Sequence, residues 1–351
     1  MTISYWRSFN GRMIKIKDES YRMKAQTVTI IGMGRTGASI GRALKSASSN
    51  LTIVGHDRYR DVVEKAKDKL QAIDKVEWNL ISAAAAADIL VLALPLTELE
   101  DTLMAIGREL QPHTLVLDMG ALKGQGLQWA NKYLKTGHYV GVVPVLAASY
   151  LKDGRDEAES AAADLFQKSI FCLMPSATAD PRAVETAVNF GRLLGATPYF
   201  VDPLEYDNLA QGIETLPGLA AVALFSALSK STGWRDMMRL ANSSFALATQ
   251  PLHYGTDLTR LALNDKAATL RWLDAYLQEL TDLRRLLAGG DKEVIDITME
   301  NIVAQREKWL IDRSENEWTE GMDTKVERPT LSNQLLGGWL GGKLSKDSRD
   351  E

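Results

Sequence analysis

One stretch constrains this chain more than any other: an apolar run that leads into a glycine-rich loop. Residues 28–31 read Val-Thr-Ile-Ile, as expected for a buried parallel strand. The next six residues form a G-x-G-x-x-G sequence, Gly32-Met33-Gly34-Arg35-Thr36-Gly37, and a helical period follows. The first glycine permits a tight turn, the second opens the backbone to a pyrophosphate, and the third lets helix and strand pack closely. The helix N-terminus then faces the phosphates.

A second strand and an acidic residue strengthen this interpretation. The apolar run 51–55 ends in His56-Asp57, and Asp57 follows Gly37 by about 20 residues, where a carboxylate would meet the adenosine ribose. We therefore predict a dinucleotide-binding site. Its expected residues are Gly32, Met33, Gly34, Arg35, Thr36, Gly37, Asp57, Arg58, Leu94 and Pro95. Asp57 favours NAD because it repels a ribose 2′-phosphate, whereas Arg58 leaves NADP open.

Strand and helix patterns alternate through the first half of the chain and give way to helices alone. Apolar strands are expected near residues 89–93, 114–118, 139–143 and 169–173, which predicts a doubly wound parallel sheet. The predicted fold class is an α/β Rossmann dinucleotide-binding domain followed by an all-α helical domain. The predicted units are an N-terminal extension (1–25), the Rossmann domain (26–178), a helical substrate and dimerisation domain (179–311) and a polar tail (312–351).

Within the helical domain, the sequence predicts a long helix from Leu204 to about Leu228 with a kink at Pro217. Another helix is expected from Trp234 to Leu247. Leucines then recur at heptad-like spacing: Leu270, Leu273, Leu277, Leu280 and Leu287. The stripe is either core within one chain or a subunit interface, and its spacing alone leaves both interpretations open.

The composition of the chain argues against several other classes of protein. The net charge of −4 gives no electrostatic reason to expect a nucleic acid or an anionic membrane as partner. The single cysteine, Cys172, excludes an intrachain disulfide, suits a reducing cytoplasm and lies in an apolar run, as expected for an inert core thiol. We expect no stretch apolar enough to cross a bilayer, no secretory signal and no metal site.

Four local segments narrow the choice among dehydrogenases. They read ADILVLALP (87–95), DMGALKG (118–124), AADLFQKSIFCLMP (162–175) and GWRDMMRLA (233–241). On these segments the chain resembles the prephenate/arogenate dehydrogenase family over roughly residues 27–310. The resemblance implies an NAD(P)-linked oxidative decarboxylation of a cyclohexadienyl carboxylic acid in tyrosine biosynthesis. It also implies a homodimer joined through the helical domain.

The chain departs from that family where the chemistry is expected. The family places a base histidine in G-x-H-P-M after the fifth strand, and here that position is Val143. The supporting serine of D-x-G-S-x-K is Ala121. The family's H-L-P-H segment reads Thr-Leu-Pro-Gly at 215–218. Neither Val143 nor Ala121 can move a proton, so the resemblance predicts a degenerate catalytic site.

Three residues of the expected substrate pocket are retained. Arg239 matches the family arginine that grips the substrate carboxylate, and Asp236 lies three residues earlier on the same helical face, where it would orient the guanidinium. Lys123 also matches and is expected to face the site. The alternatives are a surface ion pair for Arg239 and Asp236, and a solvated side chain for Lys123.

Two residues are candidates to replace the missing polar groups. Tyr206 stands where the family often has a histidine and offers a hydrogen bond, and His253 lies in a loop-like segment of the helical domain.

Three functions stay open. The first function is a dehydrogenase of this family with a rebuilt pocket, acting in the cytoplasm on a small carboxylate. The second is a non-catalytic dinucleotide-binding relative. The third is an oxidoreductase for a different, more apolar carboxylate.

Overall fold

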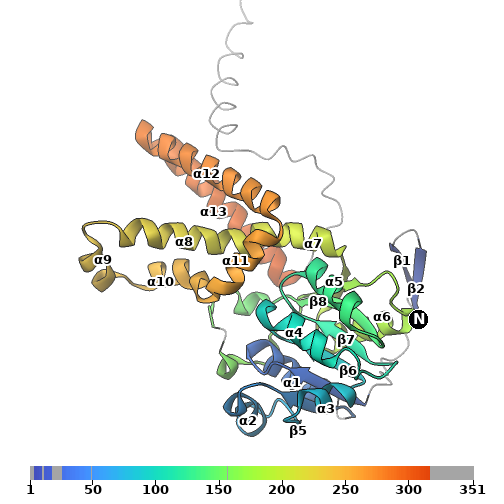
Figure 1. Ribbon diagram of the computed structural model, residues 1–351. Coiled ribbons are helices and arrows are strands. Elements are labelled where there is room, and N and C mark those ends of the chain that lie inside the picture. The colour runs from blue at the N-terminus through green and yellow to red at the C-terminus, as the bar shows by residue number, and fades with distance from the viewer. Residues whose placement is uncertain (1–3, 10–11, 18–25, 49, 156, 317–351) are drawn as a thin grey trace, which may run out of the picture.

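The computed structural model describes residues 4–9, 12–17, 26–48, 50–155 and 157–316 of the 351-residue chain. A sheet covered by helices is followed by a set of helices that projects from it as an arm (Figure 1). The predicted class, an α/β Rossmann domain followed by an all-α domain, is confirmed.

The sheet has eight strands in the order β10-β9-β8-β7-β6-β3-β4-β5. Their bounds are β3 (Thr27–Ile31), β4 (Thr52–His56), β5 (Lys75–Val76), β6 (Ile89–Leu92), β7 (Leu115–Asp118), β8 (His138–Pro144), β9 (Ile170–Pro175) and β10 (Thr197–Phe200). β3 lies between β4 and β6, so the glycine-rich loop that follows it lies at the point where the strand order reverses.

The expectation of a wholly parallel sheet is wrong at one pairing. β8 and β9 run antiparallel, with Val142 opposite Leu173 and Val143 opposite Cys172. A parallel neighbour needs a crossover connection, usually a helix. Among its described residues, the segment between β8 and β9 forms the short 3₁₀ turns η1 (Ala148–Tyr150) and η2 (Ala158–Ser160) but no crossover helix, and β9 returns in the opposite direction.

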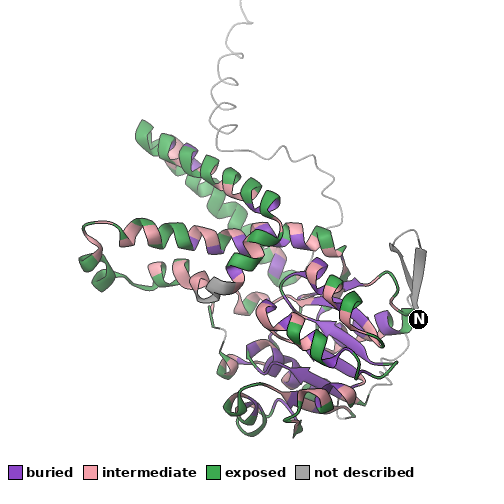
Figure 2. Ribbon diagram, in the orientation of Figure 1, coloured by how far each residue is buried: buried purple, intermediate pink, exposed green. Residues whose placement is uncertain are grey.

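Helices cover both faces of the sheet and enclose two separate cores (Figure 2). One face carries α1 (Arg35–Ala47), α2 (Arg60–Asp68) and α6 (Pro181–Leu193). The other carries α3 (Leu80–Ala85), α4 (Leu96–Ile106) and α5 (Lys123–Tyr133). On β3, Val28 and Ile30 enter the first core and Ile31 enters the second, as strand alternation requires.

The sheet continues past residue 178, where the sequence predicts the end of the Rossmann domain. α6 packs on β7, β8 and β9, and β10 then pairs in parallel with β9. The sequence predicts only an extended link over residues 199–201, and the structure makes it part of an edge strand.

The helical arm begins with a single apolar run that changes its winding. α7 (Pro203–Ala210) passes through a π-helical turn, η3 (Gln211–Thr215), into α8 (Leu216–Ser229). Pro217 has no N–H to donate to the preceding turn, and the wider π turn takes the place of the predicted kink. The predicted helix 234–247 is instead two helices, α9 (Trp234–Leu240) and α10 (Ser243–Thr249), because Asn242 caps the second one.

The arm is completed by η4 (Gln250–Tyr254), α11 (Gly255–Asn264), α12 (Lys266–Gly289) and α13 (Lys292–Glu315). The leucine stripe lies on α12, and its members Leu270, Leu277, Leu280 and Leu287 are 43 to 54% exposed. The core of this one chain therefore does not cover the stripe, and Figure 2 shows α12 and α13 largely exposed along their length.

The expectation that no segment is apolar enough to cross a bilayer is also wrong by length and composition. The continuous helical run Pro203–Ser229 includes an 18-residue window with a mean hydropathy of 1.4, of which 17% is buried. The sequence predicts one helix over most of this run, kinked at Pro217, and in the structure the π turn η3 joins α7 to α8 without a break.

The two ends of the predicted domain plan are described only in part. Within the predicted extension, β1 (Ser4–Phe9) and β2 (Arg12–Lys17) pair as an antiparallel hairpin separate from the main sheet. α13 continues past residue 311 into the predicted tail. The rest of that tail lies outside the described residues.

Candidate functional site

The glycine-rich loop has the geometry that close contact with a pyrophosphate requires. Gly32 ends β3 with φ of +92°, and a Cβ built there would lie 2.2 Å from the carbonyl oxygen of Ala93. A Cβ on Gly37 would lie 1.9 Å from the carbonyl oxygen of Gly32. A Cβ on Gly34 would meet no atom within 4 Å, so this backbone faces open space beside the N-terminus of α1. These residues therefore fit a dinucleotide.

Asp57 is held at the end of β4 by the loop itself. Its Oδ2 accepts a hydrogen bond from the backbone N–H of Met33 at 2.8 Å, and its Oδ1 accepts from that of Tyr59 at 2.9 Å. The Met33 side chain is fully buried in the core, so its part in the site is made by its backbone. The carboxylate thus stands at the edge of the loop where the predicted ribose contact needs it.

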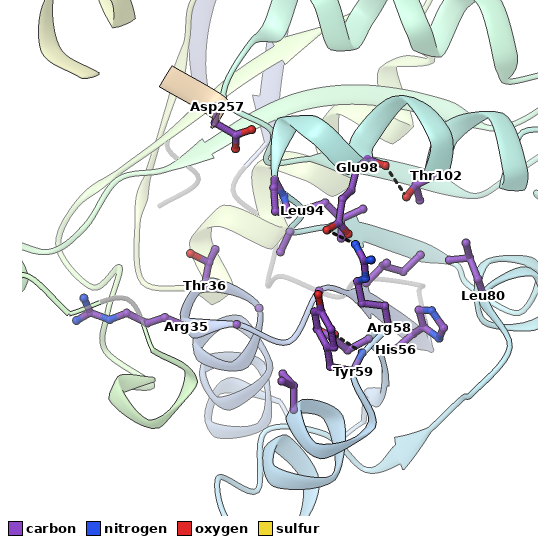
Figure 3. Close-up of a pocket in the computed structure, with 18 of the residues that line it drawn as sticks. Arg35, Thr36, His56, Arg58, Tyr59, Leu80, Leu94, Glu98, Thr102 and Asp257 are labelled. Atoms are coloured by element: carbon purple, nitrogen blue, oxygen red, sulfur yellow. Dashed lines mark hydrogen bonds and ion pairs between the residues drawn. The ribbon is translucent and has the colours of Figure 1, made fainter. Parts of the chain in front are cut away.

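The predicted cofactor residues meet around one cavity of about 660 Å³, the dinucleotide cavity (Figure 3). All of them line it except Met33. Its predicted lining residues are Gly32, Gly34, Arg35, Thr36, Gly37, Asp57, Arg58, Leu94 and Pro95. Arg58 donates to Glu98 at 2.6 Å across the cavity wall, and Glu98 is a lining residue that the sequence did not single out.

Arg35 connects the glycine-rich loop to the segment that follows β8. The side chain is 7% exposed, and its guanidinium donates to both carboxylate oxygens of Asp153 and to the carbonyl oxygen of Arg155. Burial alone would raise the pKa of Asp153, but the hydrogen bonds from Arg35 and Arg155 lower it. Arg35 is thus engaged by protein partners, and it positions the exposed Arg155 at the cavity.

Lys123 is a buried structural cation in this chain. Its ammonium donates to the carbonyl oxygens of Asp118 at 3.0 Å, Val142 at 2.8 Å and Gly120. Burial lowers the pKa of Lys123, and the nearby Asp118 and Asp207 oppose that shift. The side chain is 1% exposed and lines neither the dinucleotide cavity nor the second cavity described below.

Asp207 joins the helical arm to the sheet domain. From α7 it accepts hydrogen bonds from the backbone N–H of Lys123 at 2.7 Å and of Gly124 at 2.9 Å, at the first residues of α5. Burial raises the pKa of this carboxyl, while the two N–H groups oppose the shift. Its negative charge at a helix N-terminus is a favourable placement.

A second cavity of about 540 Å³, the junction cavity, lies between the sheet domain and the arm. Leu94, Pro95 and Asp257 line both cavities, so the two spaces adjoin. Figure 3 shows Asp257 near Leu94, at the end of the dinucleotide cavity opposite Leu80. Other lining residues of the junction cavity include Met119, Ala121, Tyr206, Ile213, Glu214, Pro217, Gly218, Gln250 and Leu258.

The positions at which the sequence predicts missing catalytic groups lie apart in the structure. Ala121 lines the junction cavity, and Pro217 and Gly218 line it beside the π turn. Val143 is half-buried on β8 and lines neither cavity. Tyr206 is in the cavity wall, and burial raises the pKa of its phenol. The side chain of His253 lies outside the described residues.

The predicted carboxylate-binding pair is not at the junction cavity of the same chain. Arg239 and Asp236 are exposed on α9, which lies at the far end of the arm in Figure 1. Neither residue lines the two cavities. Their proposed role therefore stays a prediction.

The structure adds acidic groups that sequence patterns did not reveal. Glu98, Glu214 and Asp257 come from α4, η3 and α11, and each lines at least one of the cavities. No local motif marks Glu214 or Asp257, because only the fold brings them together. Among the described residues, no group of three or more His, Cys, Asp or Glu is placed to hold a metal ion.

Comparison with known proteins places this arrangement in a family. Residues 40–199 match the family model described as prephenate dehydrogenase, nucleotide-binding domain. The dinucleotide-binding domain belongs to the prephenate dehydrogenase family. This confirms the resemblance seen in the sequence, and together with the glycine-rich loop it supports a nicotinamide dinucleotide as cofactor.

Two curated proteins are similar over most of the chain. A cyclohexadienyl dehydrogenase of Zymomonas mobilis is 23% identical over 271 residues, covering 76% of this chain and 90% of that protein. A prephenate dehydrogenase of Lactococcus lactis is 25% identical over 285 residues, covering 77% of this chain and 73% of that protein.

Solved structures share the fold. The prephenate dehydrogenase of A. aeolicus in complex with hydroxyphenyl propionate and NAD⁺ has a TM-score of 0.69 at 20% identity, covering 82% of this chain and 99% of that one. The Synechocystis arogenate dehydrogenase has a TM-score of 0.61 at 22% identity, covering 81% and 100%. The arm therefore has the same fold as the helical part of these enzymes.

The loop geometry predicts that one glycine substitution lowers stability and another weakens dinucleotide binding. Gly37→Ala forces a Cβ into the Gly32 carbonyl and should lower the free energy of unfolding by about 2 kcal/mol or more. Gly34→Ala meets open space, so it should leave stability unchanged and weaken dinucleotide binding about tenfold. Urea unfolding and NADH fluorescence titration measure the two effects. Equal stability of both variants would contradict the prediction.

Proposed function

We propose that this chain is an NAD-dependent dehydrogenase with a rebuilt catalytic pocket. The observation that carries the proposal is the adjoining pair of cavities, which share Leu94, Pro95 and Asp257. A nicotinamide at that boundary would accept or supply a hydride. A small molecule in the junction cavity would then lie beside it, in the close approach that hydride transfer requires. The two curated relatives are named as dehydrogenases, which supports the same class of reaction for this chain.

The cofactor we propose is NAD in preference to NADP. Asp57 stands where the adenosine ribose is expected, and its negative charge disfavours a 2′-phosphate. Arg58 is the neighbouring cation able to offset that charge, but its guanidinium is paired with Glu98 at 2.6 Å. The acid is therefore free to act on the ribose while the arginine is engaged.

Proton transfer cannot use the family's histidine in this chain. Val143 and Ala121 carry no ionisable group, and Tyr206 is the phenol in the junction cavity wall. We propose that Tyr206 hydrogen-bonds the substrate and that substrate positioning supplies much of the remaining rate. Loss of a general base typically costs about 10² to 10⁴ in rate, so turnover should be slow relative to enzymes that keep it.

A second candidate, an oxidoreductase for a more apolar substrate, is favoured by the cavity lining. Met119, Ala121 and Leu258 stand among other apolar side chains around the space, and Pro217 and Gly218 occupy the family's H-L-P-H segment. A non-catalytic dinucleotide-binding relative is the outcome if no substrate is turned over.

The function is tested by NADH formation from NAD with prephenate and arogenate supplied side by side. We expect slow turnover of at least one acid, because the two cavities adjoin, and a further fall of about tenfold or more in Tyr206→Phe, which removes only the hydroxyl. The matched control is Tyr199→Phe on β10, where the ring is 48% exposed and outside both cavities. No turnover by protein that binds NADH would contradict the family reaction.

Cofactor selectivity should depend on the charge of Asp57. Asp57→Asn keeps an oxygen acceptor but removes the charge, so the ratio of NADPH to NADH affinity should rise about tenfold. The exposed Asp61→Asn on α2 is the control with the same charge change. Fluorescence titration with both reduced cofactors measures the ratio, and an unchanged ratio in Asp57→Asn would exclude the proposed role.

We also propose a homodimer joined through the arm. Large apolar side chains remain exposed on three of its helices: Val222, Leu224 and Phe225 on α8, Leu270, Leu277, Leu280 and Leu287 on α12, and Ile297, Met299, Ile302, Val303, Trp309 and Ile311 on α13. Many exposed large apolar side chains on one part of a chain are typical of an interaction site.

The dimer predicts a specific sensitivity of α12. Leu277→Lys places a charge in the stripe and should shift the molecular mass in solution from about twice 38.7 kDa toward one chain. Ala275→Lys adds the same charge at an exposed position on another face of α12 and should leave the dimer intact. Light scattering after size exclusion measures the mass. A wild-type protein that is a monomer at micromolar concentration would refute the dimer.

A further inference from the structure

Among the described residues, one cation at the dinucleotide cavity has no carboxylate of its own. Three arginines line this cavity: Arg35, Arg58 and Arg155. Arg58 forms an ion pair with Glu98, another lining residue. Arg35 and Arg155 share a single carboxylate, that of Asp153, at 2.5 Å and 3.2 Å. Because a guanidinium is always charged, this cluster of two arginines and one acid has an excess positive charge.

The segment that carries this cluster lies along α1, the helix that begins at the glycine-rich loop. The hydroxyl oxygen of Ser39 accepts a hydrogen bond from the backbone N–H of Ala162 at 3.0 Å. The guanidinium of Arg42 donates to the carbonyl oxygen of Ala161 at 2.8 Å. The second turn of α1 thus holds one end of the segment, and the first turn is left to hold the other.

At that first turn, Arg35 fixes the place of Arg155. The Arg35 side chain is 7% exposed, and it donates to both carboxylate oxygens of Asp153 and to the carbonyl oxygen of Arg155. From the helical arm, the side-chain amide of Gln250 donates to the carbonyl oxygen of Gly154. Both the sheet domain and the arm therefore hold the three residues that end in Arg155.

This position places a cation at the part of the cavity that suits a phosphate. Arg155 lines the same cavity as Gly34 and Thr36, which lie at the N-terminus of α1. The first turn of α1 contains no acidic residue. A helix N-terminus offers backbone N–H groups to an anion, and an arginine adds charge-assisted hydrogen bonds in a planar fork.

The cluster is remote from the adenosine ribose end of the cavity. Figure 3 shows Arg35 on the opposite side of the cavity from His56 and Arg58. Asp57, the residue expected at the ribose, stands between those two in the sequence. Since Arg155 is joined to Arg35, it is placed to contact the diphosphate and not a ribose 2′-phosphate.

We propose that Arg155 binds the diphosphate of the dinucleotide together with the backbone N–H groups at the start of α1. Arg35 is the positioning residue, and it acts on Arg155 through Asp153 and the backbone. The proposal deepens the proposed function and rests on it for the dinucleotide, but it does not require turnover. It holds for NAD and NADP alike, because both carry the same diphosphate.

The first test removes the charge of Arg155. Arg155→Met keeps an unbranched side chain, and NADH and ADP-ribose are each titrated calorimetrically into the full-length protein. We expect both dissociation constants to rise about tenfold, because both ligands carry the diphosphate. Arg108→Met removes an exposed arginine outside both cavities, so this matched control should change neither constant by more than about twofold.

The choice of ligands separates the diphosphate from the other parts of the cofactor. ADP-ribose lacks the nicotinamide ring, so equal losses for ADP-ribose and NADH exclude a contact with that ring as the cause. The ratio of NADPH to NADH affinity should stay within about twofold in Arg155→Met, whereas Asp57→Asn should raise it.

A double mutant tests the positioning by Arg35. Arg35→Lys keeps a positive charge but cannot make the forked contact with Asp153 together with the bond to the backbone. It should weaken ADP-ribose about threefold to fivefold in the wild-type protein and have no further effect in Arg155→Met. Equal weakening in both backgrounds would show that Arg35 does not act through Arg155. Circular dichroism checks the fold, and Arg155→Met decides the proposal if Arg35→Lys fails to fold.

Two results would overturn the proposed role of Arg155: unchanged affinities for NADH and ADP-ribose in Arg155→Met, or a loss confined to NADPH. Failure of the wild-type protein to bind either ligand would overturn this proposal together with the proposed function. Binding of both ligands without turnover of any substrate would count against the proposed dehydrogenase alone.

Discussion

The carboxylate of Asp207 is the contact on which the geometry of both cavities depends. It is 5% exposed, and it accepts from the backbone N–H groups of Lys123 and Gly124, so it fastens α7 to the first turn of α5. The Lys123 side chain then ties the same turn to the carbonyl ends of β7 and β8. A negative charge at a helix N-terminus and a cation among carbonyls complement each other in this small volume. The arm is thereby placed beside the carboxyl ends of the strands.

This connection gives Lys123 a structural role in this chain. Lys123 has a structural task, since removing it would leave three buried carbonyl oxygens without their donor. Val143 and Ala121 have no comparable task, because an apolar side chain fits a half-buried strand position and a cavity wall. The fold therefore accommodates an apolar side chain at each of these two positions.

The predictions that proved wrong concern elements whose conformation depends on residues distant in the sequence. Apolar composition located β9, but its direction depends on the connection from β8, which lacks a crossover helix. Pro217 was expected to kink one helix, and the π turn before it accommodates the missing donor instead. The leucine stripe has a spacing that fits either a core or an interface, and only its exposure on α12 separates the two.

The sequence by itself determined the dinucleotide-binding domain, because its features are contiguous or regularly spaced. Gly32, Gly34 and Gly37 act through their own backbone, and Asp57 follows at the end of the next strand. Only the tertiary structure decided the junction cavity, which gathers Ala121, Glu214 and Asp257 from three separate elements. The physical reason is that the lining and charge of a cavity depend on all the side chains that packing brings together. These residues are distant in the sequence, so no local sequence pattern identifies them as a group.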